Sequence, residues 1–209
     1  QMMRDLGCTG YAGTPSFLMS LIRKAEENGL DFKNDFQVTK AVTSAEPLPP
    51  SLHAQLAGYG LTVGNAYGTA EFGLIALNMG QGMAMQLMDE PIVEVVDPET
   101  GQPVAPGAAG EVVITNFSRV YPLLRLGTGD MAMNVDPNPG ESRQSERAVI
   151  LVGRSGDAVK VRGMFVHPNQ LRFAAGQVPS VAQVQGVVTR PDLKDVFTLR
   201  ATADGEIDE

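Results

Sequence analysis

Cysteine is almost absent from this chain of 209 residues, in which Cys8 is the single thiol. One cysteine excludes an intramolecular disulfide and any zinc site built from several cysteines, and it suits a reducing compartment. We therefore expect a cytoplasmic protein. No apolar run approaches the roughly 20 residues that span a bilayer. The first residues also lack the charged-then-apolar order of a signal peptide, so no membrane span is expected.

Basic residues are few, because 16 Lys and Arg stand against 24 Asp and Glu, for a net charge of −8. This balance, without a basic stripe that is interleaved with aromatics, argues against nucleic acid as a partner. Hydrophobic residues make up 43% of the chain and charged residues 19%. Such a composition is typical of a globular protein with a sizeable core, which excludes disorder throughout.

Helix and strand signals alternate in the first third of the chain. Thr14 before Pro15 is a typical helix start, because threonine can cap free amide groups and proline fits the first helical position. Strands are predicted over 9–12, 36–42 and 61–66, and a short helix over 49–57. This alternation favours a parallel sheet with helices on its faces. The apolar face of the first long helix contains Phe17, Leu18, Leu21, Ile22 and Ala25.

From residue 74 onward the signals are those of strands alone, over 92–96, 110–115, 123–126 and 148–152, which predicts a small twisted sheet or half-barrel. Beyond residue 157, a hairpin (158–162 and 164–166), a helix (168–175) and two strands (181–189 and 196–201) indicate the start of a small α+β domain. We therefore divide the chain into a partial domain at 1–152, with an α/β part (1–73) and a β-rich part (74–152), a hinge at 153–157 and a partial domain at 158–209. Both ends have the features of internal positions, so we expect a fragment of a longer protein.

Three segments with glycine and a nearby acid carry the chemical signals. In Tyr67-Gly68-Thr69-Ala70-Glu71, a ring at a strand end can stack on a base, and the glutamate can hold magnesium that bridges phosphate oxygens. Taken alone, such a turn is common.

Asp130 ends a second segment, behind Gly129, where a carboxylate can accept both hydroxyls of a ribose. A plain surface turn is the alternative. The third segment, 152–163, mixes glycines with charged residues between two apolar runs and is typical of a flexible joint. Solvated basic side chains on an exposed hairpin are its alternative reading.

Taken in order, these segments resemble the motifs of adenylate-forming enzymes of the acyl-CoA synthetase superfamily, most of all those of the phenylacetate-CoA ligase group. The likeness runs from about Thr9 to Ala203. The resemblance implies an α/β fold: part of a large N-terminal AMP-binding domain, with a mostly parallel sheet, helices and a small β-barrel-like subdomain, followed by the start of a small α+β C-terminal domain.

The resemblance also implies roles for the first segment. Tyr67 would lie against adenine, Gly68 would also belong to the nucleotide site, and Glu71 would hold magnesium. The family has a hydroxyl where this chain has Ala70. Either Thr69, which precedes it, takes over the phosphate contact, or phosphate binding is weaker.

Further binding roles follow from the same resemblance. Asp130 would bind the ribose, with Arg125 a few residues earlier, and Gly127 stands where a second basic residue is frequent. Arg154 would contact the ribose and phosphate region. The backbone of Ser44-Ala45-Glu46-Pro47 would line the adenine pocket, as a Gly-Ala-Glu-Pro segment does in the family.

The joint is the part where the chain departs most from the family pattern. Lys160 and Arg162 match the basic residues of a hairpin that swings over the site. The pivot would lie at Gly156 and Asp157, whereas the family usually has aspartate or lysine at the first of these positions. Neither His53 nor His167 falls on a motif position, so we expect structural or solvated roles for both.

The activity implied is a two-step ligation. A carboxylic acid, aromatic or related, attacks ATP to give acyl-AMP and pyrophosphate, and coenzyme A then displaces AMP; Glu71, with Mg²⁺, and Arg154 would be catalytic. A phosphate loop and a terminal lysine segment are missing from the chain, so the fragment alone should be inactive. Two alternatives stay open: a non-catalytic nucleotide-binding or interaction module, and an adenylation domain that loads a carrier protein. A homodimer also stays open.

Overall fold

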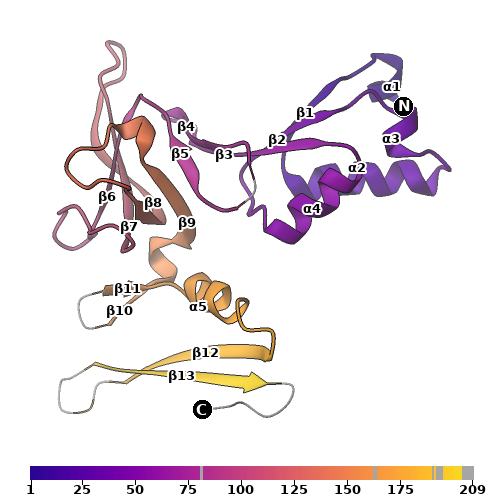
Figure 1. Ribbon diagram of the computed structural model, residues 1–209. Helices are drawn as coiled ribbons and strands as arrows, with labels where there is room; N and C mark the ends of the chain where they lie inside the picture. Colours follow the sequence, from indigo (N-terminus) through magenta and orange to yellow (C-terminus); the bar gives the residue numbers. More distant parts are fainter. Residues whose placement is uncertain (81, 162–163, 190, 192–194, 204–209) are drawn as a thin grey trace. The chain divides into compact units, whose positions relative to one another are not determined.

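The computed structural model describes residues 1–80, 82–161, 164–189, 191 and 195–203 (Figure 1). Its contacts divide the chain into two compact units. Unit 1 comprises Gln1–Val93, Asn116–Pro122 and Asp136–Ile150, and unit 2 comprises Glu94–Thr115, Leu123–Val135 and Leu151–Glu209. These two units do not test the domain boundaries expected from the sequence. Those boundaries, with a hinge at 153–157, stay a prediction.

Unit 1 is built on a mixed sheet. The strands β1 (Gly10–Gly13), β2 (Lys40–Thr43) and β3 (Thr62–Thr69) run parallel to their neighbours. β4 (Gly73–Asn78) returns antiparallel beside β3, and β5 (Met85–Leu87) is antiparallel to β4. The first residues of β9 (Ala148–Arg154) pair with β5. The α/β class expected from the sequence is confirmed; the sheet is mixed because a tight hairpin, not a crossover helix, joins β3 to β4.

Helices precede and connect the parallel strands of unit 1. α1 (Met2–Asp5) precedes β1, α2 (Pro15–Glu27) and α3 (Phe32–Asp35) lie between β1 and β2, and α4 (Pro50–Gly58) lies between β2 and β3. The predicted start of α2 is confirmed, since Thr14 Oγ1 accepts the Phe17 N–H at 3.3 Å and Pro15 occupies the first turn. The predicted start of the second strand, at residue 36, was wrong: Asp31 caps α3, and Phe36 stacks on Phe32 at 4.9 Å between ring centroids.

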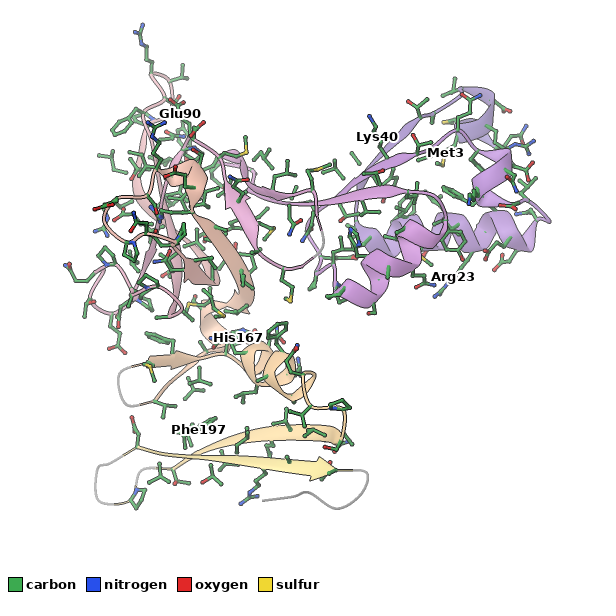
Figure 2. The ribbon with its side chains drawn as sticks, in the orientation of Figure 1. Met3, Arg23, Lys40, Glu90, His167 and Phe197 are labelled. Carbon is green, nitrogen blue, oxygen red and sulfur yellow. The ribbon has the colours of Figure 1, made fainter. Side chains whose placement is uncertain are left out.

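The core of unit 1 lies between these helices and one face of the sheet. Ile22 of α2 is fully buried there, and Ala41 and Thr43 of β2 face the same side. Lys40 and Val42 point to the opposite face and are exposed; Figure 2 shows Lys40 on the side away from α2 and α4. The prediction of the apolar face was wrong for one residue, because Phe17 is 59% exposed. The buried residues of this core are Leu18, Met19, Ile22, Ala25, Phe32, Val38, Ala41, Leu48, Leu56, Leu61 and Val63.

Unit 2 contains most of the strands that follow β5. Its strands follow the hydrogen-bonded order β9-β8-β7-β6, with β6 at Ile92–Val96, β7 at Ala109–Asn116 and β8 at Leu123–Val135. A short 3₁₀ helix (Gln144–Glu146) precedes β9 and belongs to unit 1. β8 is far longer than predicted, because its two glycines continue the strand where the sequence suggested that it ends. Ala109 of β7, Met131 of β8 and Val152 of β9 pack together in one hydrophobic cluster.

The end of unit 2 has the predicted α+β pattern. A 3₁₀ turn (Ser155–Asp157) leads into the antiparallel pair β10 (Val159–Val161) and β11 (Met164–Val166), then α5 (Pro168–Ala175) and the antiparallel pair β12 (Val181–Thr189) and β13 (Val196–Ala203). Arg162 lies outside the described residues. Gly186 lets α5 approach β12, since a β-carbon there would lie 2.7 Å from Leu171 Cδ1 and 3.0 Å from the ring of Phe197, which Figure 2 marks on β13.

None of the helices in the described part of the chain combines the length and the apolar composition that crossing a bilayer requires.

We predict that Ile22→Ala lowers the free energy of unfolding by about 2–5 kcal/mol, because it leaves a cavity in the core of unit 1. Phe17→Ala on the same helix is the matched control and should change it by no more than about 0.5 kcal/mol, because that ring is largely in solvent. Urea unfolding followed by circular dichroism measures both. Equal losses for the two variants would contradict this assignment of the buried face.

Candidate functional site

Asp130 and Arg154, which come from separate sequence motifs, meet in unit 2. Arg154 Nη1 lies 2.5 Å from Asp130 Oδ1 and also donates to the Thr128 carbonyl at 3.3 Å. Asp130 lies on β8 and Arg154 ends β9, its neighbour in the sheet. The Asp130 side chain is 20% exposed and that of Arg154 65% exposed. A carboxylate and a guanidinium are thus presented together near the surface.

The backbone before Asp130 is shaped to bring this pair together. Gly129 has a φ of 73°, in the region that favours glycine. A β-carbon on Gly129 would also lie 2.7 Å from Arg154 Nη2. The Asp130 N–H donates to Thr128 Oγ1 at 3.1 Å, and that hydroxyl donates to the Val112 carbonyl on β7 at 2.9 Å. The glycine that the sequence suggested as a turn therefore allows the close approach of the arginine.

Arg125 points to a different place. Its Nε and Nη2 donate to the Glu94 carboxylate on β6 at 3.0 and 3.3 Å, and Nη2 donates to the Gly101 carbonyl at 2.7 Å. β6 lies beyond β7, whereas Arg154 comes from β9 on the other side of β8. The structure thus does not join Arg125 to the Asp130–Arg154 pair, and its nucleotide role stays a prediction.

The predicted adenine and magnesium residues lie at the end of β3 in unit 1. Tyr67 is buried, whereas Gly68 and Glu71 are exposed. Gly68 sits so close to the Gly73 carbonyl of β4 that a β-carbon there would overlap it. Thr69 Oγ1 is buried and has no hydrogen-bond partner among the described residues. A buried hydroxyl without a partner is uncommon in proteins, which makes this atom a candidate donor to a ligand.

Ser44, Ala45 and Glu46 follow β2, at the same edge of the sheet, because β2 and β3 are parallel. Ala45 adopts a φ of 67°, which is unusual for a residue with a β-carbon. The Glu46 carboxylate accepts from the Ser16 N–H at 3.2 Å and from the Ser16 hydroxyl at 2.8 Å. Its charge stabilises the amino end of α2. Burial and this nearby carboxylate raise the pKa of Tyr11. Glu46 therefore has a structural task, whatever its neighbours bind.

The joint contains two glycines, which differ in the space available for a side chain. Gly156 lies in the 3₁₀ turn without a left-handed φ, and a β-carbon there would meet nothing within 4 Å. Gly153 has a φ of 147°, and a β-carbon there would overlap the His167 ring. In this conformation it is Gly153 that cannot carry a side chain. The pivot at Gly156 and Asp157 stays a prediction, as does the role of Lys160, which lies in β10.

His167 is a residue whose contacts the sequence did not reveal. It is buried, and its Nδ1 accepts the Asn169 N–H at 3.1 Å, so it caps α5. Burial lowers its pKa, against a smaller opposite effect of Asp157. Because Nδ1 accepts the Asn169 N–H, a ring proton lies on Nε2, which has no hydrogen-bond partner among the described residues. Figure 2 shows His167 at the start of α5. The capping role of His167 was hard to predict from the sequence, because histidine is not a typical helix cap.

Asn169 completes the attachment of α5. Its side-chain amide donates to the Val152 carbonyl at 2.8 Å, directly before Gly153. Together with the packing of His167 on Gly153, this bond ties the amino end of α5 to the end of β9.

Metal-binding side chains do not gather in the described ranges, which contain no group of three or more His, Cys, Asp or Glu that could hold an ion.

Comparison with known proteins gives consistent results. The family described as AMP-binding enzyme matches residues 1–118, more than half of the chain. Phenylacetate-coenzyme A ligase of Pseudomonas putida is 30% identical over 196 residues, which cover 88% of this chain and 42% of that protein. The protein of the same name from Thermus thermophilus is 28% identical over 189 residues, which cover 85% and 41%. The chain thus spans about two fifths of the length of these curated relatives.

Among solved structures, 2-hydroxyisobutyryl-CoA ligase is similar in an open conformation in complex with 2-HIB-AMP and CoA. The TM-score is 0.73 at 25% identity, over 96% of this chain and 45% of that one. The expected architecture, part of an adenylate-forming ligase fold, is confirmed by this likeness.

We predict that Gly153→Ala lowers the free energy of unfolding by about 1–3 kcal/mol, because the new methyl group would overlap the His167 ring. Gly156→Ala is the matched control, since that position is open, and it should change stability little. In a His167→Ala background the alanine at 153 should cost less, because the obstructing ring is gone. Thermal unfolding of the four variants measures these differences. An undiminished cost in the His167→Ala background would show that the ring is not the obstacle.

Proposed function

The chain belongs to the AMP-binding enzyme family, and on this basis we propose that it is part of an ATP-dependent carboxylate–CoA ligase similar to phenylacetate-CoA ligase. The full-length protein would activate an aromatic or related carboxylic acid as acyl-AMP and transfer the acyl group to coenzyme A. The names of the curated relatives support this assignment. So does the similar ligase that was solved with an acyl-AMP and CoA.

The observation that carries the proposal is the contact between Asp130 and Arg154. A carboxylate of this kind accepts the two ribose hydroxyls, and a guanidinium neutralises phosphate oxygens. In a nucleotide these groups are only a few bonds apart. We therefore propose that these two neighbouring side chains would bind the ribose and the phosphate of one AMP molecule.

By the same resemblance, we propose roles in nucleotide binding for the residues that follow β2 and end β3. We assign Tyr67, Gly68 and the backbone of Ser44–Glu46 to adenine. The buried Thr69 hydroxyl is an atom that a phosphate oxygen would satisfy, which suits the replacement of the family hydroxyl by Ala70.

Magnesium fits this chain as an ion that arrives with the nucleotide. Glu71 is an exposed carboxylate, and the described residues offer no cluster that could hold a resident ion. Mg²⁺ typically takes one or two carboxylates and completes its coordination with substrate phosphates and water. When bound, it would offset the charge that develops on the triphosphate.

The chain's own residues would act by binding and alignment. Arg154 would neutralise charge on the phosphate that the carboxylic acid attacks, while Asp130 holds the ribose in place. No protein nucleophile is needed, because the acid and then the coenzyme A thiol attack directly. The segment 153–157 would be the hinge between domains at 1–152 and 158–209, with Lys160 brought to the site by rotation.

The proposal is tested by pyrophosphate exchange with the full-length protein and a panel of carboxylic acids, followed by acyl transfer to coenzyme A. Exchange that depends on an aromatic acid, with thioester formation, supports it. Exchange with transfer only to a carrier protein would favour an adenylation domain. Binding of AMP without exchange for any acid would favour a non-catalytic module.

For Glu71→Gln we predict that exchange falls about tenfold or more and that a higher magnesium concentration is needed for half-maximal rate, because a hard cation loses an anionic ligand. Glu27→Gln, an exposed acid on α2, is the control and should behave like the unchanged protein. An unaltered rate and magnesium dependence in the first variant would remove Glu71 from the site.

For Asp130→Ala we predict that AMP binding weakens by about 1.5–3 kcal/mol, the scale of a hydrogen bond to a charged group. Binding of an analogue without ribose hydroxyls should weaken much less. Calorimetric titration of both ligands measures the difference. Equal losses for the two ligands would mean that Asp130 does not contact the ribose.

A further inference from the structure

Glu111 on β7 reaches across to the backbone of β8. Its Oε1 accepts the Gly129 N–H at 2.9 Å. The next residue of β7, Val112, accepts the Thr128 hydroxyl through its carbonyl, also at 2.9 Å. Two consecutive residues of β7 therefore hold two consecutive residues of β8, directly before Asp130.

The Glu111 carboxylate also occupies the space beside Gly127. A β-carbon on Gly127 would lie 2.8 Å from Glu111 Oε1 and 3.3 Å from its Cδ. Gly127 has no left-handed φ, so its backbone would accept other residues. The carboxylate is thus the group that a side chain at 127 would have to displace, at the position where the resemblance led us to expect a second basic residue.

Gly129 lies between Glu111 and Arg154. Its N–H is bound by the Glu111 carboxylate, and the place of its missing β-carbon is 2.7 Å from Arg154 Nη2. The following residue, Asp130, pairs with the same guanidinium. A shift of the Gly129 peptide would therefore move both the surface against which Arg154 lies and the carboxylate with which it pairs.

We propose that Glu111 is a positioning residue of the nucleotide site. Without touching the nucleotide, its carboxylate fixes the backbone from Gly127 to Asp130. In this way it sets the direction of the Asp130 carboxylate and the Arg154 guanidinium. The inference rests on the proposed function, because Glu111 would position side chains that bind AMP.

The first test is AMP binding to the full-length protein, measured calorimetrically. Glu111→Ala should weaken binding about tenfold or more, because Gly129 loses a hydrogen bond to a charged group. Glu111→Gln should stay within about threefold of the unchanged protein, since its amide oxygen can accept the same N–H. The Glu111→Ala protein should also lose most of its preference for AMP over 2′,3′-dideoxy-AMP, because Asp130 is no longer aimed at the ribose.

The second test uses Gly127→Ala, which leaves Glu111 in the chain but displaces its carboxylate. It should weaken AMP binding to a similar extent as Glu111→Ala. The double variant should be no more than about threefold weaker than Glu111→Ala alone, because both changes break the same contact. Gly58→Ala at the end of α4 is the control for glycine replacement, since a β-carbon there meets nothing within 4 Å.

The outcomes separate this inference from the proposed function. If the unchanged protein does not bind AMP, the proposed function fails. If it binds AMP and Glu111→Ala binds equally well, with equal ribose preference, the positioning role fails. Should Glu111→Ala not fold, as its melting curve would reveal, the comparison of Gly127→Ala with Gly58→Ala decides, and equal affinities overturn the inference. Independent, additive losses in the double variant would also overturn it.

Discussion

The pairing of Asp130 with Arg154 depends on the backbone at Gly129, whose conformation favours glycine. Gly129 adopts a left-handed φ, and Arg154 lies where a side chain at 129 would stand. The sheet supplies the rest of the constraint, because β8 and β9 are neighbours while the two residues are far apart in the sequence. Charged groups at a surface keep a fixed direction only when their backbone is fixed. The Glu111 carboxylate and the Thr128 hydroxyl provide that restraint.

This ion pair contributes to geometry more than to stability. Arg154 is largely in solvent, and exposed pairs are typically worth about 0–1 kcal/mol because water screens them. The stability of unit 1 comes from its buried apolar core, and His167 and Asn169 anchor α5 in unit 2.

Several residues that belong to a functional motif also make structural contacts. Glu46 binds the amino end of α2, and Arg125 bridges Glu94 and the Gly101 carbonyl. A motif aligns residues by position, and position alone does not distinguish a ligand contact from a buried or helix-capping contact. Glu111 is the converse case, because it stands outside every recognised motif and yet binds the backbone of one.

The sequence alone determined the local elements: Thr14-Pro15 starts α2, α5 and β12 have their predicted bounds, and the alternation of helix and strand indicated the α/β class. These follow from propensity, capping and periodicity, which act between residues close in the chain. Tertiary structure decided that β8 continues through its glycines, that Phe17 faces solvent and that Gly153 lies against His167. It also decided that Asp130, Arg154 and Glu111 converge on Gly129. Such contacts join residues on different strands, and their partners are chosen by strand order and close packing, which no local pattern encodes.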